Sequence, residues 1–260
     1  MYSRPCVILS GAKDLYIMLR IYFYQLNTAD LTEHADRYIA LLPPWRTERY
    51  HRMKLQNGRL EELAAGLLLR HALKDAAGID LMTAEVTKNE HGKPMLGAGT
   101  KTNGAKAYAA MSKTAGNPAP TGGATAGPAV HFNISHSGGY IAVAVSDHPV
   151  GIDVETKSDP DLKVTARFYS EAEQAAVRAA EDPQKAFRRL WTRKEAYVKC
   201  AGTGIYDSVA EIPSLEDVSG EYRLFTLREE DAYTLSVVVQ GEITMDISDI
   251  PLDIVTFFDV

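Results

Sequence analysis

The stretch from Val150 to Lys199 constrains this chain more than any other. It opens with an apolar run, residues 150–155, that carries Asp153 and Glu155 two positions apart. In an extended strand, alternate side chains share one face, so both carboxylates point the same way. Two like charges in an otherwise apolar strand need a compensating cation or partner. The run therefore predicts a buried strand that delivers two carboxylates to one place.

The same stretch closes with a helical segment, residues 191–199. Glu195 and Lys199 lie four positions apart and therefore share one helix face. Three hard oxygen ligands and an ammonium group favour Mg²⁺ holding a phosphate or pyrophosphate. The alternative is a surface ion pair between Glu195 and Lys199. That alternative leaves the two carboxylates in the apolar strand unexplained.

Two segments of this stretch carry a family resemblance: Gly151-Ile152-Asp153-Val154-Glu155, and Trp191-Thr192-Arg193-Lys194-Glu195-Ala196 followed by Lys199. Together they resemble the signature of the 4'-phosphopantetheinyl transferases of the surfactin-synthetase-activating type. The resemblance implies transfer of phosphopantetheine from coenzyme A to a serine of an apo acyl or peptidyl carrier protein, with release of adenosine 3',5'-bisphosphate. It also implies an α+β fold, a pseudo-symmetric pair of similar halves with the active site at their interface.

The resemblance implies roles for the residues of the signature. Asp153, Glu155 and Glu195 would hold Mg²⁺, and Lys199 would neutralise a phosphate of coenzyme A. Glu195 is also the best placed general base for the serine. Whether it acts as ligand, base or both stays open.

Further matches imply contacts to coenzyme A. Arg46 and Arg49 follow a Pro-Pro pair and match basic positions that contact its 3'-phosphate. A Gly-Lys-Pro turn contributes Lys93 and Pro94, and the run Phe132-Asn133-Ile134-Ser135-His136-Ser137 contributes Ser135 and His136. The sequence departs from the family pattern at one position, where Glu62 replaces an expected basic residue. Without the resemblance, the segment that contains Arg46 and Arg49 is interpreted as a solvated helix face. The turn at Lys93 and the side chain of His136 are then interpreted as structural.

Charge and cysteine content narrow the class of protein. The net charge of −6 gives no overall attraction for nucleic acid. With Cys6 and Cys200 as its only cysteines, the chain predicts reduced thiols and a cytoplasmic setting rather than disulfides or a zinc site. No apolar run has the length of a membrane span, and no secretory signal precedes the first strand. The resemblance, rather than the composition, implies a monomer that serves carriers of secondary-metabolite or fatty-acid synthesis.

Periodicity alone predicts an α+β chain, and the resemblance implies its division into two halves. Residues 1–17 form an N-terminal extension, 18–149 an N-terminal half and 150–260 a C-terminal half with the metal-site motifs. Residues 97–129, rich in Gly, Ala, Thr and Pro, are expected to be a flexible insertion that the chemistry does not need. We expect helices over 59–75, from a Ser170 cap, and from Asp182 to Gly202. Strands at 222–227, 232–240 and 254–258 are expected to complete one sheet.

Two other functions remain open. One is a binding module that retains coenzyme A but does not transfer its arm. The other is a Mg²⁺-dependent phosphohydrolase using the same carboxylates, which would cleave coenzyme A without a carrier protein. Carrier contacts are expected in the segment after Glu155 and on the helix at 170–180.

Overall fold

The computed structural model describes residues 7–9, 16–97, 99–100, 130–156, 167–204, 207–241, 250 and 252–255. Most of the predicted N-terminal extension lies outside these residues, apart from β1 (Val7–Leu9) and the start of β2 (Tyr16–Gln25). Residues 98 and 101–129 of the predicted insertion lie outside them as well, as does the segment 157–166. The predictions made for those segments therefore stay predictions.

Strands and helices are mixed along the whole described chain, as expected for an α+β protein. After β2 come α1 (Thr28–Glu33), α2 (Ala35–Ile39), α3 (Pro44–Arg52), α4 (Gln56–Ala77), β3 (Val86–Lys88), β4 (Pro94–Leu96), β5 (His131–Ser137) and β6 (Tyr140–Ser146). The second part contains β7 (Val150–Thr156), α7 (Glu171–Ala179), α8 (Pro183–Ala201), the short 3-10 helix η1 (Asp207–Glu211), β8 (Val218–Ser219), β9 (Tyr222–Glu229), β10 (Tyr233–Gln240) and β11 (Leu252–Ile254).

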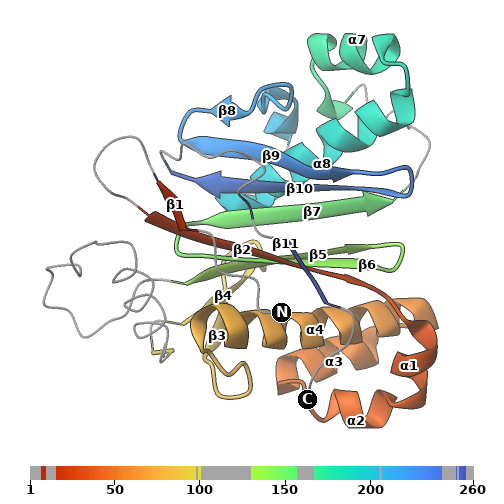
Figure 1. Ribbon diagram of the computed structural model, residues 1–260, viewed down its shortest axis with the longest axis vertical. Helices are drawn as coiled ribbons and strands as arrows, with labels where there is room; N and C mark the ends of the chain where they lie inside the picture. The colour runs from red at the N-terminus through yellow and green to blue at the C-terminus, as the bar shows by residue number, and fades with distance from the viewer. Residues whose placement is uncertain are drawn as a thin grey trace, which may run out of the picture.

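The two main sheets lie face to face between two long helices (Figure 1). One sheet has the order β1-β2-β6-β5, with β11 beside β2, and the other has the order β7-β10-β9-β8. Alternate residues of β2 divide between two cores. Tyr22 and Tyr24 pack with the leucines of α4, whereas Ile21 and Phe23 pack against Ile152 and its neighbours in the opposite sheet. Period-two alternation thus builds the layers α4, sheet, sheet and α8.

Local signals set the ends of the two helices in the second half. The Ser170 side chain accepts from the Glu173 backbone N–H while Glu173 accepts from that of Ser170, which is the predicted capping box. Asp182 caps α8, and Gly202 ends it with a φ of 72°. A left-handed residue at this position favours glycine, which explains why the helix stops there.

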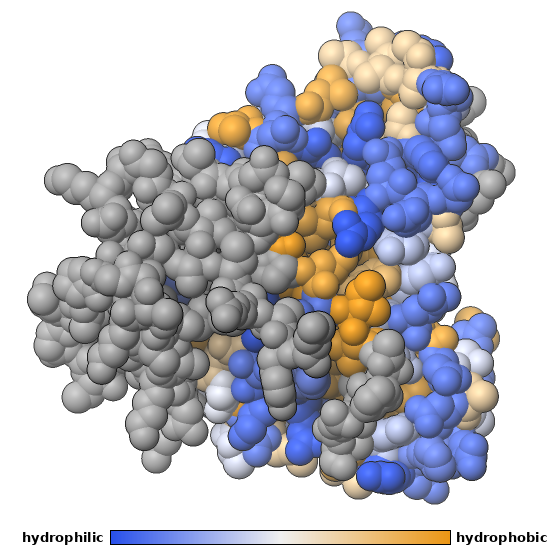
Figure 2. Space-filling view, viewed as in Figure 1, coloured by the Kyte–Doolittle hydropathy of each residue, from blue (hydrophilic) through white to orange (hydrophobic). Residues whose placement is uncertain are grey.

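The last described strand corrects the prediction that the three C-terminal strands complete one sheet. Strands β9 and β10 do pair with each other, but β11 runs parallel to β2 in the other sheet. A side-chain ion pair between Asp253 and Arg20, at 2.8 Å, holds β11 there. The surface of this side of the molecule is apolar through its middle, where β2 and β11 lie, with polar surface above and below (Figure 2).

Candidate functional site

The two signature segments meet because β7 and α8 pack with their backbones in direct contact. At Gly151, an added Cβ atom would lie 2.0 Å from the Ala196 carbonyl oxygen and 2.4 Å from the Cys200 nitrogen. Only glycine permits this approach. It places the strand's alternate residues, Asp153 and Glu155, on the face that α8 covers.

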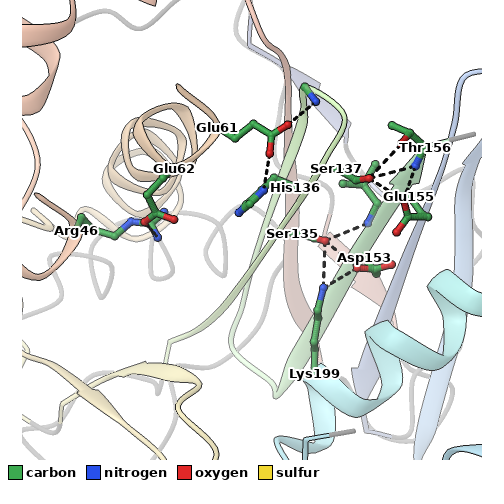
Figure 3. Close-up of polar contacts among 12 residues, drawn as sticks. Arg46, Glu61, Glu62, Ser135, His136, Ser137, Asp153, Glu155, Thr156 and Lys199 are labelled. Atoms are coloured by element: carbon green, nitrogen blue, oxygen red, sulfur yellow. Dashed lines mark hydrogen bonds and ion pairs between the residues drawn. The ribbon is translucent and has the colours of Figure 1, made fainter. Parts of the chain in front are cut away.

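Asp153 and Ser135, which are buried, form one polar cluster with the half-buried Lys199 (Figure 3). The Lys199 ammonium group donates to Asp153 Oδ1 at 2.6 Å and to the Ser135 hydroxyl at 3.1 Å. The hydroxyl in turn donates to Asp153 Oδ1 at 2.7 Å. Asp153 Oδ2 is buried and has no hydrogen-bond partner among the described residues. A buried carboxylate oxygen without a partner is costly unless something else compensates it.

Glu155 is held in the same manner one step along the strand. Its Oε1 atom accepts from the Ser137 hydroxyl at 2.7 Å and from the Thr156 backbone N–H at 3.0 Å. Among the described residues, no hydrogen bond reaches its other carboxylate oxygen. Ser137 was not singled out from the sequence. The alternating polar residues 133, 135 and 137 of β5 were the available signal.

The ionisation of the Glu195 carboxyl group depends on its burial and on the charges around it. Burial raises the pKa of its carboxyl group to about 7, and the negative charges of Asp153 and Glu155 add to the increase, against the opposing effect of Lys199. Both carboxylates therefore lie near enough to Glu195 to act on its ionisation. A group that ionises near neutrality can accept a proton during a reaction.

This raised pKa predicts a pH dependence of stability. The folded protein binds the Glu195 proton more tightly than the unfolded chain does, so the free energy of unfolding should fall as pH rises from 4.5 to about 7. The measurement is urea denaturation of the metal-free protein across this range, with a Glu195→Gln variant beside it. The variant should lack this part of the slope. Identical slopes in both proteins would contradict the assignment.

The site fits a divalent cation in charge and donor type. Asp153, Glu155 and Glu195 supply hard oxygen donors of the kind that Mg²⁺ prefers, and the unpartnered Asp153 Oδ2 is available to it. As the side chains stand, no group of three acidic, His or Cys residues in the described chain is close enough together to hold an ion. The three carboxylates thus lie in one region without forming a closed metal site, and a bound cation would draw them closer together.

Arg46 and Arg49 meet at Glu62, the position that departs from the family pattern. Glu62 is fully buried on α4, and its Oε1 atom lies 2.7 Å from Arg46 Nη1 and 3.1 Å from Arg49 Nε. Burial lowers the pKa of Arg46 to about 10, while Glu62 opposes that change. Arg46 Nε and Nη2 are buried without hydrogen-bond partners in the part of the chain that the structure describes, and Arg49 is 41% exposed. The carboxylate of Glu62 therefore pairs with the two arginines that were predicted to bind a phosphate.

Close packing brings α3 onto α4 at this point. A Cβ atom on Gly66 would lie 2.7 Å from the side chain of Leu42 and 3.3 Å from Arg46 Nε. The absence of a side chain at Gly66 therefore makes room for Leu42 and Arg46.

Lys93 is bonded to the end of α8. Its ammonium group donates to the carbonyl oxygens of Val150 at 3.3 Å, of Cys200 at 3.4 Å and of Lys199. These three bonds use all the hydrogens of an ammonium group. Burial lowers the pKa of Lys93. In this conformation the Gly-Lys-Pro turn, with Pro94 starting β4, ties the β3–β4 hairpin to the helix that carries Glu195.

His136 is oriented by a residue that was not predicted. Glu61 on α4 contacts His136 Nδ1 through Oε2 at 3.2 Å and accepts from the Gly139 backbone N–H through Oε1 at 2.8 Å (Figure 3). One carboxylate thus fixes both the ring and the β5–β6 turn. Acidic residues on an amphipathic helix are ordinarily solvated, so nothing local in the sequence marked Glu61.

Other residues of the second segment have structural roles. Trp191 stacks on Phe187, with ring centroids 6.5 Å apart, and is therefore a packing residue. Lys194 is fully buried and donates to the carbonyl oxygens of Val209 and Ile212, at 2.8 and 2.7 Å. It also pairs with Glu173 at 3.0 Å. These contacts fix the rotation of α8 and thereby the direction of Glu195.

Two further observations concern the class of protein. Cys200 is buried as a free thiol, and burial raises its pKa to about 12. Within the described parts of the chain, no helix has both the length and the apolar character needed to cross a bilayer.

Comparisons with known proteins agree with the motifs. A sequence model of the 4'-phosphopantetheinyl transferase superfamily matches residues 149–255. The chain is 44% identical over 79 residues to 4'-phosphopantetheinyl transferase gsp of Aneurinibacillus migulanus, which covers 30% of this chain and 33% of that protein. It is 27% identical over 189 residues to a 4'-phosphopantetheinyl transferase of Bacillus subtilis, covering 72% of each chain. 4'-phosphopantetheinyl transferase Sfp of Bacillus subtilis strain 168 is 23% identical over the same share.

The matched region contains both signature segments and therefore Asp153, Glu155, Glu195 and Lys199. These segments are the ones that the packing of β7 on α8 brings to one place. In both its motifs and these comparisons, the chain is similar to the 4'-phosphopantetheinyl transferase superfamily.

Proposed function

We propose that this protein transfers the 4'-phosphopantetheine group of coenzyme A to a serine hydroxyl of an apo acyl or peptidyl carrier protein. The observation that carries the proposal is the convergence of β7 and α8, through which Lys199 reaches Asp153 across 46 positions of sequence. Carboxylates with a lysine beside them suit a reaction at a pyrophosphate. The similarity to the superfamily suggests the type of reaction, and the residues of the site provide a base, a positive charge and metal ligands for it.

The steps assign a role to each group. The serine oxygen attacks the β-phosphorus of coenzyme A, a new P–O bond forms, and the bond to the adenosine 3',5'-bisphosphate leaving group breaks. Glu195 accepts the serine proton, for which a pKa of about 7 is suitable. Lys199 offsets negative charge on the pyrophosphate. When bound, Mg²⁺ would supply further charge neutralisation, with Asp153, Glu155 and Glu195 as its protein ligands.

We infer that the coenzyme lies between two halves of the molecule, residues 18–149 and 150–260, which are pseudo-symmetric. Support comes from the long helices α4 and α8, each of which covers the outer face of one sheet (Figure 1). Arg46, Arg49, Lys93, Pro94, Ser135 and His136 are proposed as coenzyme contacts. Arg49 is the best supported of these for an anion, since it is partly exposed and basic. Lys93 and Ser135 would have to exchange present bonds for such a contact.

We also propose a cytoplasmic monomer that acts on carriers of secondary-metabolite or fatty-acid synthesis. Its buried, unreactive Cys200 thiol suits a reducing compartment. No role for nucleic acid or membrane is proposed.

The test is the intact mass of a panel of apo carrier proteins after incubation with this protein, coenzyme A and Mg²⁺. A gain of one phosphopantetheine, absent after EDTA treatment, is the expected result. Tight binding of coenzyme A with no change in any carrier would favour the binding module. Cleavage of coenzyme A without a carrier would favour the phosphohydrolase.

Glu62 is expected to weaken the preference for the 3'-phosphate. A Glu62→Gln substitution removes the carboxylate that neutralises Arg46 and Arg49, so coenzyme A should bind roughly tenfold more tightly, about 1.4 kcal/mol. Binding of dephospho-coenzyme A, which lacks the 3'-phosphate, should not improve. Isothermal titration calorimetry with both ligands measures the difference.

A matched control for this variant is Glu48→Gln. Glu48 lies on α3, is exposed and pairs with Arg52 at 3.0 Å, so its loss changes the net charge equally without touching Glu62. The same gain in affinity from both variants would show a general charge effect and contradict the assignment to Glu62. Because Glu62 is buried in an ion pair, its variant should also be less stable, by roughly 3–5 kcal/mol without ligand.

A further inference from the structure

The two sheets are joined at their edges by side chains rather than by a backbone ladder. Among the described strands, β5 pairs in its backbone with β6 and β7 with β10. Between β5 and β7, the polar side chains of Asn133, Ser135 and Ser137 take the place of a partner strand. They accept from alternate backbone N–H groups of β7, at 3.0, 3.3 and 3.4 Å, those of Ile152, Val154 and Thr156. We call these three side chains the seam ladder.

Two members of the seam ladder also hold the two carboxylates. Ser135 donates its hydroxyl proton to Asp153 Oδ1, and Ser137 donates to Glu155 Oε1, both at 2.7 Å. Each serine lies 18 positions before its carboxylate, so the contact repeats with the period of the strand. In both pairs one carboxylate oxygen is bonded, and the other has no hydrogen bond from the described residues.

The seam ladder thereby fixes the direction of each carboxylate. A Glu side chain has several rotatable bonds, and ordering it costs free energy at the moment of binding. A serine hydroxyl that already bonds one oxygen meets this cost in the folded protein and leaves the second oxygen available. The backbone N–H that each serine accepts from belongs to the residue after the carboxylate, so strand and side chain are held together.

We propose that Ser137 is a positioning residue for Glu155, which directs Glu155 Oε2 toward the cation site shared with Asp153. The proposal rests on the proposed function, in which Glu155 is a Mg²⁺ ligand. Ser137 touches neither substrate nor cation. It acts through the carboxylate alone, as hydrogen-bonding partners of metal ligands do.

The test compares Ser137→Ala with Ser137→Thr, which keeps the hydroxyl, and with a matched control, Ser146→Ala. Ser146 is a buried serine on the neighbouring strand β6, and its hydroxyl accepts from the His148 backbone N–H at 3.0 Å. No hydrogen bond joins this hydroxyl to a carboxylate of the described residues. Mg²⁺ binding is measured by titration calorimetry on each full-length protein, and the Mg²⁺ concentration for half-maximal carrier modification is measured separately.

Ser137→Ala should weaken Mg²⁺ binding and raise the half-maximal Mg²⁺ concentration by roughly 10- to 100-fold. Saturating Mg²⁺ should restore most of kcat, Ser137→Thr should remain near wild type, and Ser146→Ala should lose stability alone. Unchanged Mg²⁺ affinity in Ser137→Ala, or equal losses in Ser137→Ala and Ser146→Ala, would overturn the proposal. If the wild-type protein binds Mg²⁺ but modifies no carrier, the proposed function fails, and the calorimetry still decides the role of Ser137.

Discussion

Replacing Glu195 by glutamine is expected to slow phosphopantetheine transfer by roughly 10²- to 10⁴-fold. Glutamine keeps the size and much of the hydrogen bonding of the side chain but neither carries a negative charge nor accepts the serine proton. Both proposed roles of Glu195, as base and as ligand, are therefore lost together. The measurement is the initial rate of carrier modification, followed by intact mass at saturating coenzyme A.

The same substitution should stabilise the metal-free protein. Since burial and two neighbouring carboxylates raise the pKa of Glu195 to about 7, its ionised form is unfavourable in the fold above that pH. A neutral side chain removes this cost, so urea denaturation at pH 8 should give a larger free energy of unfolding for Glu195→Gln. Lower activity with higher stability separates a functional residue from a structural one.

A charge-matched control and a metal titration complete this experiment. Glu33 is an exposed residue at the end of α1, outside every proposed contact, and Glu33→Gln should leave the transfer rate unchanged. If raising Mg²⁺ restores the rate of Glu195→Gln, the ligand role dominates. If it does not, the base role dominates. A wild-type rate at ordinary Mg²⁺ would refute both roles.

Gly151→Ala is expected to lower the free energy of unfolding by about 3 kcal/mol, the upper range for overpacking a core. The added Cβ atom would meet the Ala196 carbonyl oxygen at 2.0 Å and the Cys200 nitrogen at 2.4 Å, well inside an ordinary contact of 3.4–4 Å. Both are backbone atoms of α8, so no side-chain rotation relieves the clash. Strand and helix must separate instead.

Separation of β7 from α8 would also affect the site. Lys199 is carried by α8 and Asp153 by β7, and their 2.6 Å ion pair depends on the close approach. Urea denaturation gives the stability, and the intact-mass assay gives the activity of the folded fraction. Gly58→Ala is the control, since Gly58 lies in α4 with no neighbour nearer than Met53 Sδ at 3.9 Å. Gly58→Ala should stabilise the protein by up to about 1 kcal/mol. An equal midpoint of unfolding for Gly151→Ala and wild type would contradict the close contact of β7 with α8 at Gly151.

The α+β class and most secondary elements followed from local sequence. The Ser170–Glu173 capping box, the Asp182 cap and the Gly202 stop each rely on hydrogen bonds within a few residues of one another. The face shared by Asp153 and Glu155 followed from strand periodicity. Such features need only the chain around them, and for that reason they can be read from it.

Pairings between distant segments were decided by the tertiary structure. The sequence identified Glu62 as a departure but gave no sign that it pairs with both Arg46 and Arg49. Lys93 was predicted to contact coenzyme A, and the fold bonds it to the end of α8. Each partner lies on another element, and the choice among many possible partners depends on how whole layers pack.

The sequence by itself determined which residues are candidates for the chemistry and which strand and helix present them. Only the tertiary structure decided how they are held: Gly151 lets α8 approach, and Ser135 and Ser137 orient the two carboxylates. Strand β11 likewise joins β2 rather than the sheet of β9 and β10. The physical reason is the distance along the sequence over which each kind of interaction acts. Caps and periodicity act within about one turn or one strand, whereas these contacts are selected by the burial of surfaces that the complete fold alone brings together.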